Sequence, residues 1–442
     1  MRKSKTTTLV IAFAIMVLVT GTLTAAGTNE VTNKEPVELT WVHWFTQSEQ
    51  DMFIDPAIRK FEELHPDIKI KTQFYTNKEY FKQLAVDIAI GGEADIVTLD
   101  SGDGFSAYYT IRQGGSFTPL GKYLNSYVSK DDTDLGDVDL LDSYQIDGQI
   151  VALPWFTYAA PVTVYRKSLL KEAGIDPTDL AQWTTYYEAA KKLTRDTDKD
   201  GKIDVYGFAH QTEGSTLIRW WTMPWLWQMD GGIFPSENGP YTADRLVWNS
   251  DANVQACEYL SKMINECGPK GKYTVIDAYQ LFANGNLATM QASSWCFDAY
   301  ERIMGADYAR EDIGVVQLPS NGERLPVTTT WGNPLAISTN CEHPQEAFEF
   351  IAFLHGEFAQ NLLPRIPVNR TARATYAEKH PFQAGALDMV LKSELRSVPD
   401  IIQWRELDNI IQKSLENAFL GTMPVKQALD WGQQEMIKTM NH

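Results

Sequence analysis

Cysteine is scarce in this chain of 442 residues, and none occurs before position 257. The four cysteines form no CxxC pair and no cluster with histidine, so the sequence gives no support for a zinc site or thioredoxin-like redox chemistry. If Cys257 and Cys267 lie on one straight helix, they are roughly 15 Å apart along its axis, beyond the roughly 7 Å limit of a disulfide. The other two cysteines are Cys296 and Cys341. We expect the four cysteines either to form disulfides other than Cys257–Cys267 or to be buried free thiols, and we expect Cys257 to lie in the core.

The chain also lacks the short motifs of the common enzyme classes. No GxSxG, HExxH, Walker A or DFG-type pattern occurs, so nucleophilic, zinc-dependent and phosphoryl-transfer catalysis have no motif to support them. A secreted carbohydrate-active enzyme remains an alternative, because it needs only two suitably separated carboxylates and the chain has 57 acidic residues. We expect a protein without enzymatic activity and without a cofactor.

Positive charge is in the minority, with 39 Lys and Arg against 57 Asp and Glu and a net charge of −18 at pH 7. Such a surface repels nucleic acid and anionic lipid, so we expect no nucleic-acid partner. The apolar run over residues 9–19 is far shorter than the roughly 20 residues that span a bilayer. Beyond it the sequence has no second run long enough to cross a membrane.

The N-terminus has the pattern of a secretory signal peptide. Arg2, Lys3 and Lys5 precede the apolar run, and small residues ending at Ala26 suit cleavage. Removal of residues 1–26 would change the net charge to −21, because this segment holds three basic and no acidic side chains. No cysteine lies near the cleavage point to receive a lipid anchor, so we expect a free protein in a periplasm.

Strand and helix patterns alternate along the first part of the chain. Residues 37–45 and 68–74 alternate apolar and polar positions, residues 94–100 predict a buried strand, and helical spacing lies between them. We expect Ser48 to cap the first helix and Gly91 to end the second. Strands that alternate with helices predict an α/β fold with mostly parallel sheets.

A second set of elements follows a predicted turn near Pro154. Residues 162–167 predict a strand, residues 182–193 a helix, and a further strand and helix follow over residues 335–354. The spacing of Val254, Cys257, Leu260 and Ile264 predicts another helix, and the last eighty residues look helical. Because the length exceeds what one core usually supports, we expect two lobes.

Several of the 13 tryptophans lie where a predicted strand or helix ends. A sugar offers apolar C–H patches on its ring faces and hydroxyls around its edge, so flat aromatic surfaces with a few polar groups match it. Core packing is the alternative for each tryptophan. Asp100 and Asp103, after the strand over residues 94–100, would add hydrogen bonds, unless they only cap a turn. The tryptophans concerned are Trp44, Trp155, Trp221, Trp295 and Trp331.

The segment DTDKDGKID partly matches a calcium-binding loop. Its carboxylates occupy the first, third, fifth and ninth loop positions, and glycine occupies the sixth. The twelfth position, where a bidentate glutamate is expected, is Gly207, so we expect no metal site and keep calcium as a weaker alternative to a solvated acidic turn. The four carboxylates are Asp196, Asp198, Asp200 and Asp204.

Several segments together carry a resemblance to a known family: LTWVHWF, FEELHPDIKI, GEADIVTLD, DGQIVALPW, YRKSLLKEAGID, QLFANGNLATMQASSW and GNPLAIST. With these segments the chain resembles the bacterial extracellular solute-binding proteins of family 1, which include the maltose-binding protein. The resemblance runs from about residue 37 to the C-terminus. It implies a two-lobed periplasmic-binding-protein fold of the type II kind, with a hinge of crossing strands and lobes that close on a ligand. It also implies that the protein is a monomer that delivers a sugar to the permease subunits of an ABC transporter.

The resemblance further implies lobe boundaries and site residues. One lobe would comprise residues 35–152 and 313–360, and the other residues 153–312 and 361–442. The first side and hinge would contribute Trp44, Asp100, Asp103, Trp155 and Tyr158; the second side would contribute Trp221, Trp295 and Trp404, with Trp331 near a hinge crossing.

Two departures from the maltose-binding branch make maltose itself doubtful. This chain has Leu99 where that branch has an aromatic residue, and Tyr158 where it has an acidic one. A mono- or oligosaccharide is expected. The same receptor with a polyol, a glycerol phosphate or a peptide as ligand is the alternative, although a phosphate would need cationic groups that the candidate residues lack.

Overall fold

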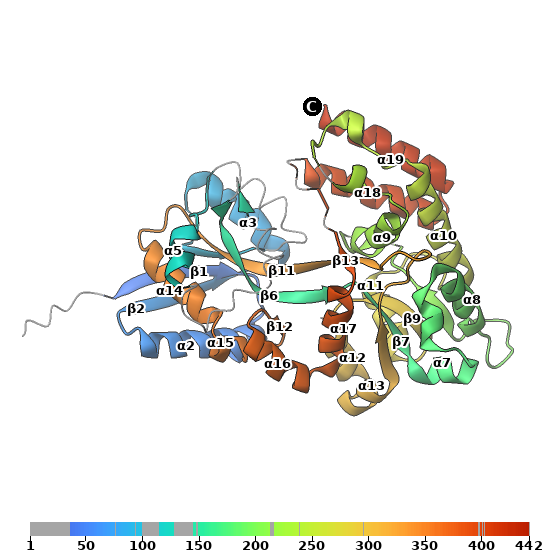
Figure 1. Ribbon diagram of the computed structural model, residues 1–442, viewed down its shortest axis with the longest axis horizontal. Coiled ribbons are helices and arrows are strands. Elements are labelled where there is room, and N and C mark those ends of the chain that lie inside the picture. Colours follow the sequence, from blue (N-terminus) through green and yellow to red (C-terminus); the bar gives the residue numbers. More distant parts are fainter. Residues whose placement is uncertain are drawn as a thin grey trace, which may run out of the picture. The chain divides into compact units, whose positions relative to one another are not determined.

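The computed structural model describes residues 36–75, 77–92, 94–99, 115–127, 145–146, 149–212, 216–237, 239–294, 296–396, 398–399, 401 and 403–441 (Figure 1). In this part the chain alternates helices and strands, and most strands join two sheets. The predicted signal segment, residues 1–26, lies outside it. None of the helices described combines the length and the apolar character needed to cross a membrane.

The first sheet has the strand order β12-β6-β11-β3-β1-β2, and β13 pairs with β11. β1 is parallel to β2 and β3, whereas β11 is antiparallel to both β3 and β6. The strands are β1 (Val37–His43), β2 (Ile68–Phe74), β3 (Ile96–Thr98), β6 (Ala152–Ala160), β11 (Val327–Ile337), β12 (Ile366–Pro367) and β13 (Glu394–Leu395).

Helices α2 (Asp55–Leu64) and α3 (Asn77–Ile90) return the chain between the parallel strands of this sheet. α2 has proline in its first turn and ends at Leu64, just before His65 and Pro66, where helical geometry is disfavoured. α3 is followed by Gly91 in the left-handed conformation that glycine adopts without strain.

Aromatic packing joins distant parts of the chain in the core of the first sheet. The Trp41 ring on β1 meets the Trp155 ring on β6 edge to face, with centroids 5.2 Å apart. Phe350, on α14 (Pro344–Leu354), contacts the Trp41 ring at 5.6 Å. Residues more than 300 positions apart therefore share one core, and these contacts pack β1, β6 and α14 against one another.

The second sheet has the order β10-β7-β9-β8. Its strands are β7 (Val162–Arg166), β8 (Tyr206–Ala209), β9 (Leu287–Ala292) and β10 (Ile313–Val316). β8 is parallel to β9, and β7 is antiparallel to both β9 and β10. At the end of β7 the Arg166 guanidinium forms a buried ion pair with Asp312, next to the start of β10.

Helix α8 (Trp183–Leu193) packs so closely on β8 that only glycine fits between them. A Cβ atom on Gly207 would lie 1.9 Å from the carbonyl oxygen of Ala190. The Gly207 N–H donates to the Thr194 hydroxyl at 3.0 Å, which fastens the strand to the end of the helix.

One residue links the two sheets where the chain first passes between them. β6 ends at Ala160 and β7 begins at Val162, so Pro161 alone separates them. The Thr328 hydroxyl on β11 donates to the Pro161 carbonyl at 2.8 Å. The neighbouring strand β11 therefore supports this link, and the two strands run side by side in Figure 1.

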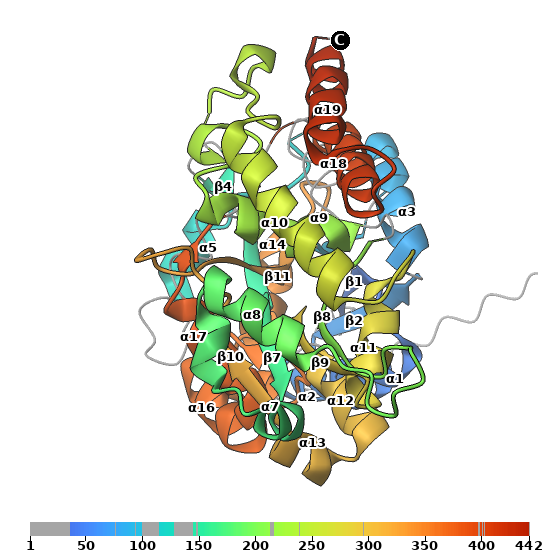
Figure 2. The same ribbon diagram turned by 90° about the vertical axis from the view of Figure 1, so that its right-hand side faces the viewer.

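Most of the remaining chain is helical, and α18 and α19 lie side by side in both views (Figures 1 and 2). The remaining helices are α1 (Gln47–Glu49), α5 (Gly121–Tyr127), α7 (Lys167–Ala173), α9 (Thr216–Gln228), α10 (Asp251–Cys267), α11 (Val275–Ala283), α12 (Cys296–Met304), α13 (Ala306–Asp312), α15 (Glu357–Gln360), α16 (Arg370–Lys379), α17 (Pro381–Leu391), α18 (Trp404–Phe419) and α19 (Val425–Met440). A π-helical turn (Gln50–Ile54), 3₁₀ turns at Pro177–Ala181, Pro235–Glu237 and Ala243–Arg245, and the short hairpin of β4 (Gln145–Ile146) and β5 (Gln149–Ile150) complete the elements.

The predicted order of strands and helices agrees with the structure, with three differences. Thr46 rather than Ser48 caps the first helix, because its hydroxyl accepts the Glu49 N–H in a capping box. Pro154 lies within β6 rather than in a turn. Both sheets are mixed rather than mostly parallel, because β11 and β7 enter them in the opposite direction.

Sheet membership bears on the predicted lobe boundaries. Residues 153–160 belong to β6 of the first sheet, and residues 313–316 form β10 of the second sheet. β12 also joins the first sheet, although it follows residue 360. The boundaries at 152, 312 and 360 remain predictions.

Candidate functional site

The register of the paired strands β6 and β11 brings two predicted site residues opposite each other. Tyr158 on β6 lies opposite Trp331 on β11. Of Trp331 only the backbone is described. On the other side of Tyr158, β12 pairs with β6 so that Arg365, just before Ile366, lies beside it. The Arg365 Nε donates to the Tyr158 hydroxyl at 3.3 Å.

Arg365 also contacts the segment that follows β1. Its Nη2 lies 2.7 Å from Oε1 of Glu49, and about one fifth of each side chain is exposed, 20% and 19%. The other carboxylate oxygen of Glu49 accepts the backbone N–H and the hydroxyl of Thr46, both at 2.9 Å. Sequence patterns did not indicate Arg365 or Glu49, because their partners are hundreds of positions away in the chain.

Trp44 follows β1 and lies within an aromatic group. Its ring stacks on Phe45, with centroids 5.5 Å apart, and lies 5.0 Å from the ring of Tyr80 on α3. The side chain of Trp44 is half-buried, so part of the ring reaches the surface. This arrangement is compatible with the flat contact surface that was predicted for it.

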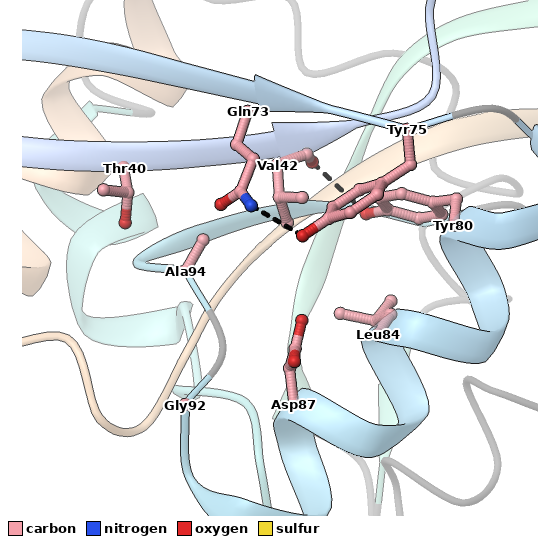
Figure 3. Close-up of a pocket in the computed structure, with 9 residues that line it drawn as sticks. All are labelled: Thr40, Val42, Gln73, Tyr75, Tyr80, Leu84, Asp87, Gly92 and Ala94. Atoms are coloured by element: carbon pink, nitrogen blue, oxygen red, sulfur yellow. Dashed lines mark hydrogen bonds between the residues drawn. The ribbon is translucent and has the colours of Figure 1, made fainter.

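A pocket of about 260 Å³ lies between α3 and the face of β1 and β2 (Figure 3). In Figure 3 the Tyr75 hydroxyl and the Asp87 carboxylate point toward one another, and Gln73 donates to that hydroxyl at 2.6 Å. The pocket is smaller than the roughly 300 Å³ of most ligand sites, so it suits a small polar molecule rather than an oligosaccharide. Its lining is Thr40, Val42, Gln73, Tyr75, Tyr80, Leu84, Asp87, Gly92 and Ala94.

Polar residues gather at the carboxyl ends of β8 and β9. Because the two strands are parallel, His210 and Gln211 after β8 lie at the same edge of the sheet as Ser293 and Ser294 after β9, and all four are buried. Ligands of α/β proteins bind beyond the carboxyl ends of such strands. None of these four residues was predicted from the sequence.

Gln291, on β9 at this edge, has an amide with neither its nitrogen nor its oxygen hydrogen-bonded to any described residue, although the side chain is only 3% exposed. Thr163 lies opposite Gln291 on β7, and its buried hydroxyl also has no hydrogen-bond partner among the described residues. Nearly all buried polar groups in proteins are paired, so these atoms call for a further hydrogen-bonding group. A ligand hydroxyl or a water would supply it.

Three predicted tryptophans are buried in the cores. Trp155 is 1% exposed among Trp41, Phe45 and Phe53. Trp221 on α9 is 2% exposed, and within the described part of the chain its indole N–H has no hydrogen-bond acceptor. Trp404 begins α18 in the core beside the second sheet. The predicted residues Asp100, Asp103 and Trp295 lie outside the described residues.

The acidic loop brings three of its four carboxylates together. Candidate ligand atoms of Asp196, Asp198 and Asp204 lie within 4.8 Å of one another, whereas Asp200 pairs with Lys202 at 3.2 Å. Asp196 accepts the N–H groups of its own loop, and Asp204 accepts from Thr197. The twelfth position, Gly207, is within β8 and offers no carboxylate. These hydrogen bonds are those of an acidic turn, and calcium stays the weaker alternative for this loop.

The four cysteines are buried free thiols, which confirms one of the two expectations. Cys257 lies in the core beside the second sheet, as predicted, and burial raises the pKa of its thiol well above the usual range. Burial also lowers the pKa of two histidines to about 4: His43 at the end of β1 and His210 after β8. Both are therefore neutral at pH 7.

Comparison with known proteins gives a consistent result. The model of a family described as bacterial extracellular solute-binding proteins matches residues 46–360. An arabinooligosaccharide-binding protein of Bacillus subtilis is 23% identical over 356 residues, which cover 78% of this chain and 76% of that protein.

Solved structures share the fold. An ABC substrate-binding protein of Listeria monocytogenes in complex with cycloalternan has a TM-score of 0.72 at 22% identity, covering 92% of this chain and 99% of that one. An ABC transporter solute-binding protein of Thermotoga lettingae bound with α-D-tagatose has a TM-score of 0.70 at 18% identity, covering 91% and 100%. The predicted two-lobed α/β fold is thereby confirmed.

Proposed function

The chain belongs to the bacterial extracellular solute-binding proteins, and we propose that it captures a mono- or oligosaccharide and delivers it to the permease of an ABC importer. The observation that supports the sugar assignment is the pair of buried side chains Gln291 and Thr163, which lie opposite each other and whose polar atoms have no hydrogen-bond partner among the described residues. Together with aromatic rings they match the hydroxyls and the C–H faces of a sugar. The relatives named above bind arabinooligosaccharides, cycloalternan and tagatose, which supports this class.

The proposed solute site combines two groups of residues. Trp44, Tyr158 and Trp331 would offer aromatic contacts on the first side and at the strand crossing. Gln291 would donate and accept hydrogen bonds at the edge of the second sheet. The roles of Asp100, Asp103, Trp155, Trp221, Trp295 and Trp404 stay predictions.

The cellular setting follows from the family and from the N-terminal pattern. Members of an extracellular family are exported, and we propose cleavage near Ala26 and a free monomer in the periplasm. We also propose that the protein releases its ligand chemically unchanged, because the site needs no catalytic group to bind a sugar.

Thermal unfolding of the mature protein against a panel of sugars, polyols, sugar phosphates and peptides tests the proposal. A ligand that binds only the folded state raises the midpoint with its concentration. We expect saccharides to raise it, and chromatography of the bound sugar to recover the same molecule. A protein freed of endogenous ligand whose midpoint responds only to peptides or phosphates would contradict the sugar assignment, and recovery of a cleaved product would contradict a pure receptor.

Gln291→Leu tests the site itself. We expect weaker saccharide binding, while the ligand-free protein unfolds with unchanged or higher free energy, because the variant removes polar atoms whose burial without partners costs about 1–3 kcal/mol. Gln360→Leu is the matched control, since the buried Gln360 amide donates to the carbonyls of Trp155 and Leu354. That control should lose stability. Unchanged saccharide affinity in Gln291→Leu would remove Gln291 from the site.

A further inference from the structure

Arg365 lies beside the proposed site with its charge already matched. Its guanidinium donates to the Tyr158 hydroxyl at 3.3 Å and to the Glu49 carboxylate at 2.7 Å. Tyr158 is on the strand that crosses beside Trp331, and Glu49 follows the segment that holds Trp44. Three distant parts of the chain thus meet at this ion pair.

Both carboxylate oxygens of Glu49 accept hydrogen bonds, which hold the side chain in place. One oxygen accepts from Arg365, and the other accepts the backbone N–H and hydroxyl of Thr46 at 2.9 Å. Because the carboxylate is held on both sides and four fifths of it is buried, the counter-charge cannot swing away to solvent at little cost. The Glu49 carboxylate therefore offsets the positive charge of Arg365 beside Tyr158.

We propose that Glu49 makes the solute site selective for uncharged sugars by neutralising Arg365. This inference rests on the proposed sugar-binding function and adds the charge class of the solute. An unpaired guanidinium is well suited to hold a carboxylate or phosphate. With Glu49 in place, an anionic sugar would meet the negative charge of Glu49 close to the positive charge of Arg365, and it would lose its own hydration for little gain.

Tyr158 links Arg365 to the proposed site. Its phenol oxygen accepts a hydrogen bond from the Arg365 guanidinium at 3.3 Å. Arg365 thus acts as a positioning residue for the Tyr158 hydroxyl, and Glu49 acts as a specificity residue through Arg365.

Glu49→Gln tests the proposal with little risk to the fold, because glutamine also completes a capping box with threonine. Calorimetric affinities would be measured for matched neutral and acidic sugars, galactose with galacturonate, glucose with glucuronate, and their disaccharides. The wild-type protein should prefer the neutral member of each pair that it binds. In Glu49→Gln the affinity for the uronate, relative to its neutral partner, should rise about tenfold or more, as a new charge-assisted hydrogen bond permits.

Two further variants make the result specific. Arg365→Gln in the Glu49→Gln background should abolish the gain for uronates. Glu172→Gln removes the same charge beside Arg195, 3.1 Å away in an ion pair outside the proposed site, and should leave the preference unchanged. A wild-type protein that binds uronates as tightly as neutral sugars, or an unchanged ratio in Glu49→Gln, would overturn this inference alone. Failure of the wild-type protein to bind any sugar would overturn the proposed function as well.

Discussion

His43 and His210 are fully enclosed imidazoles whose charged forms the folded protein excludes. Burial lowers the pKa of each to about 4, whereas an unfolded chain would titrate them near 6.5. Between these pH values the unfolded state binds more protons than the folded state. The contribution of these histidines to stability is therefore fully present above pH 6.5 and is lost as the pH falls toward 4. Burial lowers the pKa of His355 in the same direction.

Glu237 opposes this trend. Burial raises the pKa of its carboxyl to about 7, so its contribution is fully present below about pH 4.5 and is lost as the pH rises through 7. Because three histidines oppose one carboxyl, we expect the unfolding free energy to fall between pH 7 and pH 5. Urea unfolding at the two pH values measures this fall. Glu237→Gln should enlarge the fall by about 2 kcal/mol, and a fall that stays the same would show that Glu237 does not titrate as described.

The chemical character of single residues could be inferred from the sequence better than their exposure. Aromatic residues at strand ends predict a sugar site, and the half-buried Trp44 is compatible with that prediction, which remains untested. Trp155 has the same sequence context, yet four aromatic neighbours enclose it. Gln291 gave no sequence signal, because a glutamine becomes informative only when its surroundings leave it unpaired.

At the level of elements, the contact between α8 and β8 depends on one missing side chain. Gly207→Ala would place a methyl group against the backbone of Ala190, which cannot rotate away. We expect a loss of about 3 kcal/mol in unfolding free energy, at the upper end of the usual cost of overpacking. Chemical denaturation measures it.

Gly385→Ala is the matched control for that prediction. Gly385 lies inside α17, and a Cβ atom there would have no neighbour within 4 Å. Alanine should therefore raise the unfolding free energy by about 0.5–1 kcal/mol, because glycine loses more backbone freedom in a helix. Equal effects of the two substitutions would show that the close approach at Gly207 is not what limits that position.

Elements with a clear local pattern were predictable, including the three-residue strand β3, whereas the two-residue strand β12 was not. The helix spacing of Ala57, Ile58 and Phe61 and the alternation over residues 68–74 correspond to α2 and β2. β12 has only two residues and is defined by its pairing with β6. No local sequence pattern therefore predicts it. Because Arg365 reaches Tyr158 through that pairing, the ion pair with Glu49 was equally invisible in the sequence.

For the whole molecule, the proposed function requires lobes that close around the solute. Pro161 alone links β6 to β7, so the few backbone bonds at this crossing have to absorb part of any change in the relation of the two sheets. We expect the radius of gyration from small-angle X-ray scattering to decrease when the saccharide from the thermal panel is added. Gln291→Leu at the same sugar concentration should show a smaller decrease, and an unchanged radius in the saturated wild-type protein would argue against closure.

The four buried thiols have a practical consequence for such experiments. Maleimides and similar reagents need an accessible thiolate, and none of the native cysteines offers one in the folded protein. A cysteine introduced on the surface of each lobe would thus be modified selectively, with the natural cysteines left in place. A donor and acceptor dye, or a pair of spin labels, could then report the distance between the lobes in single molecules as sugar is added.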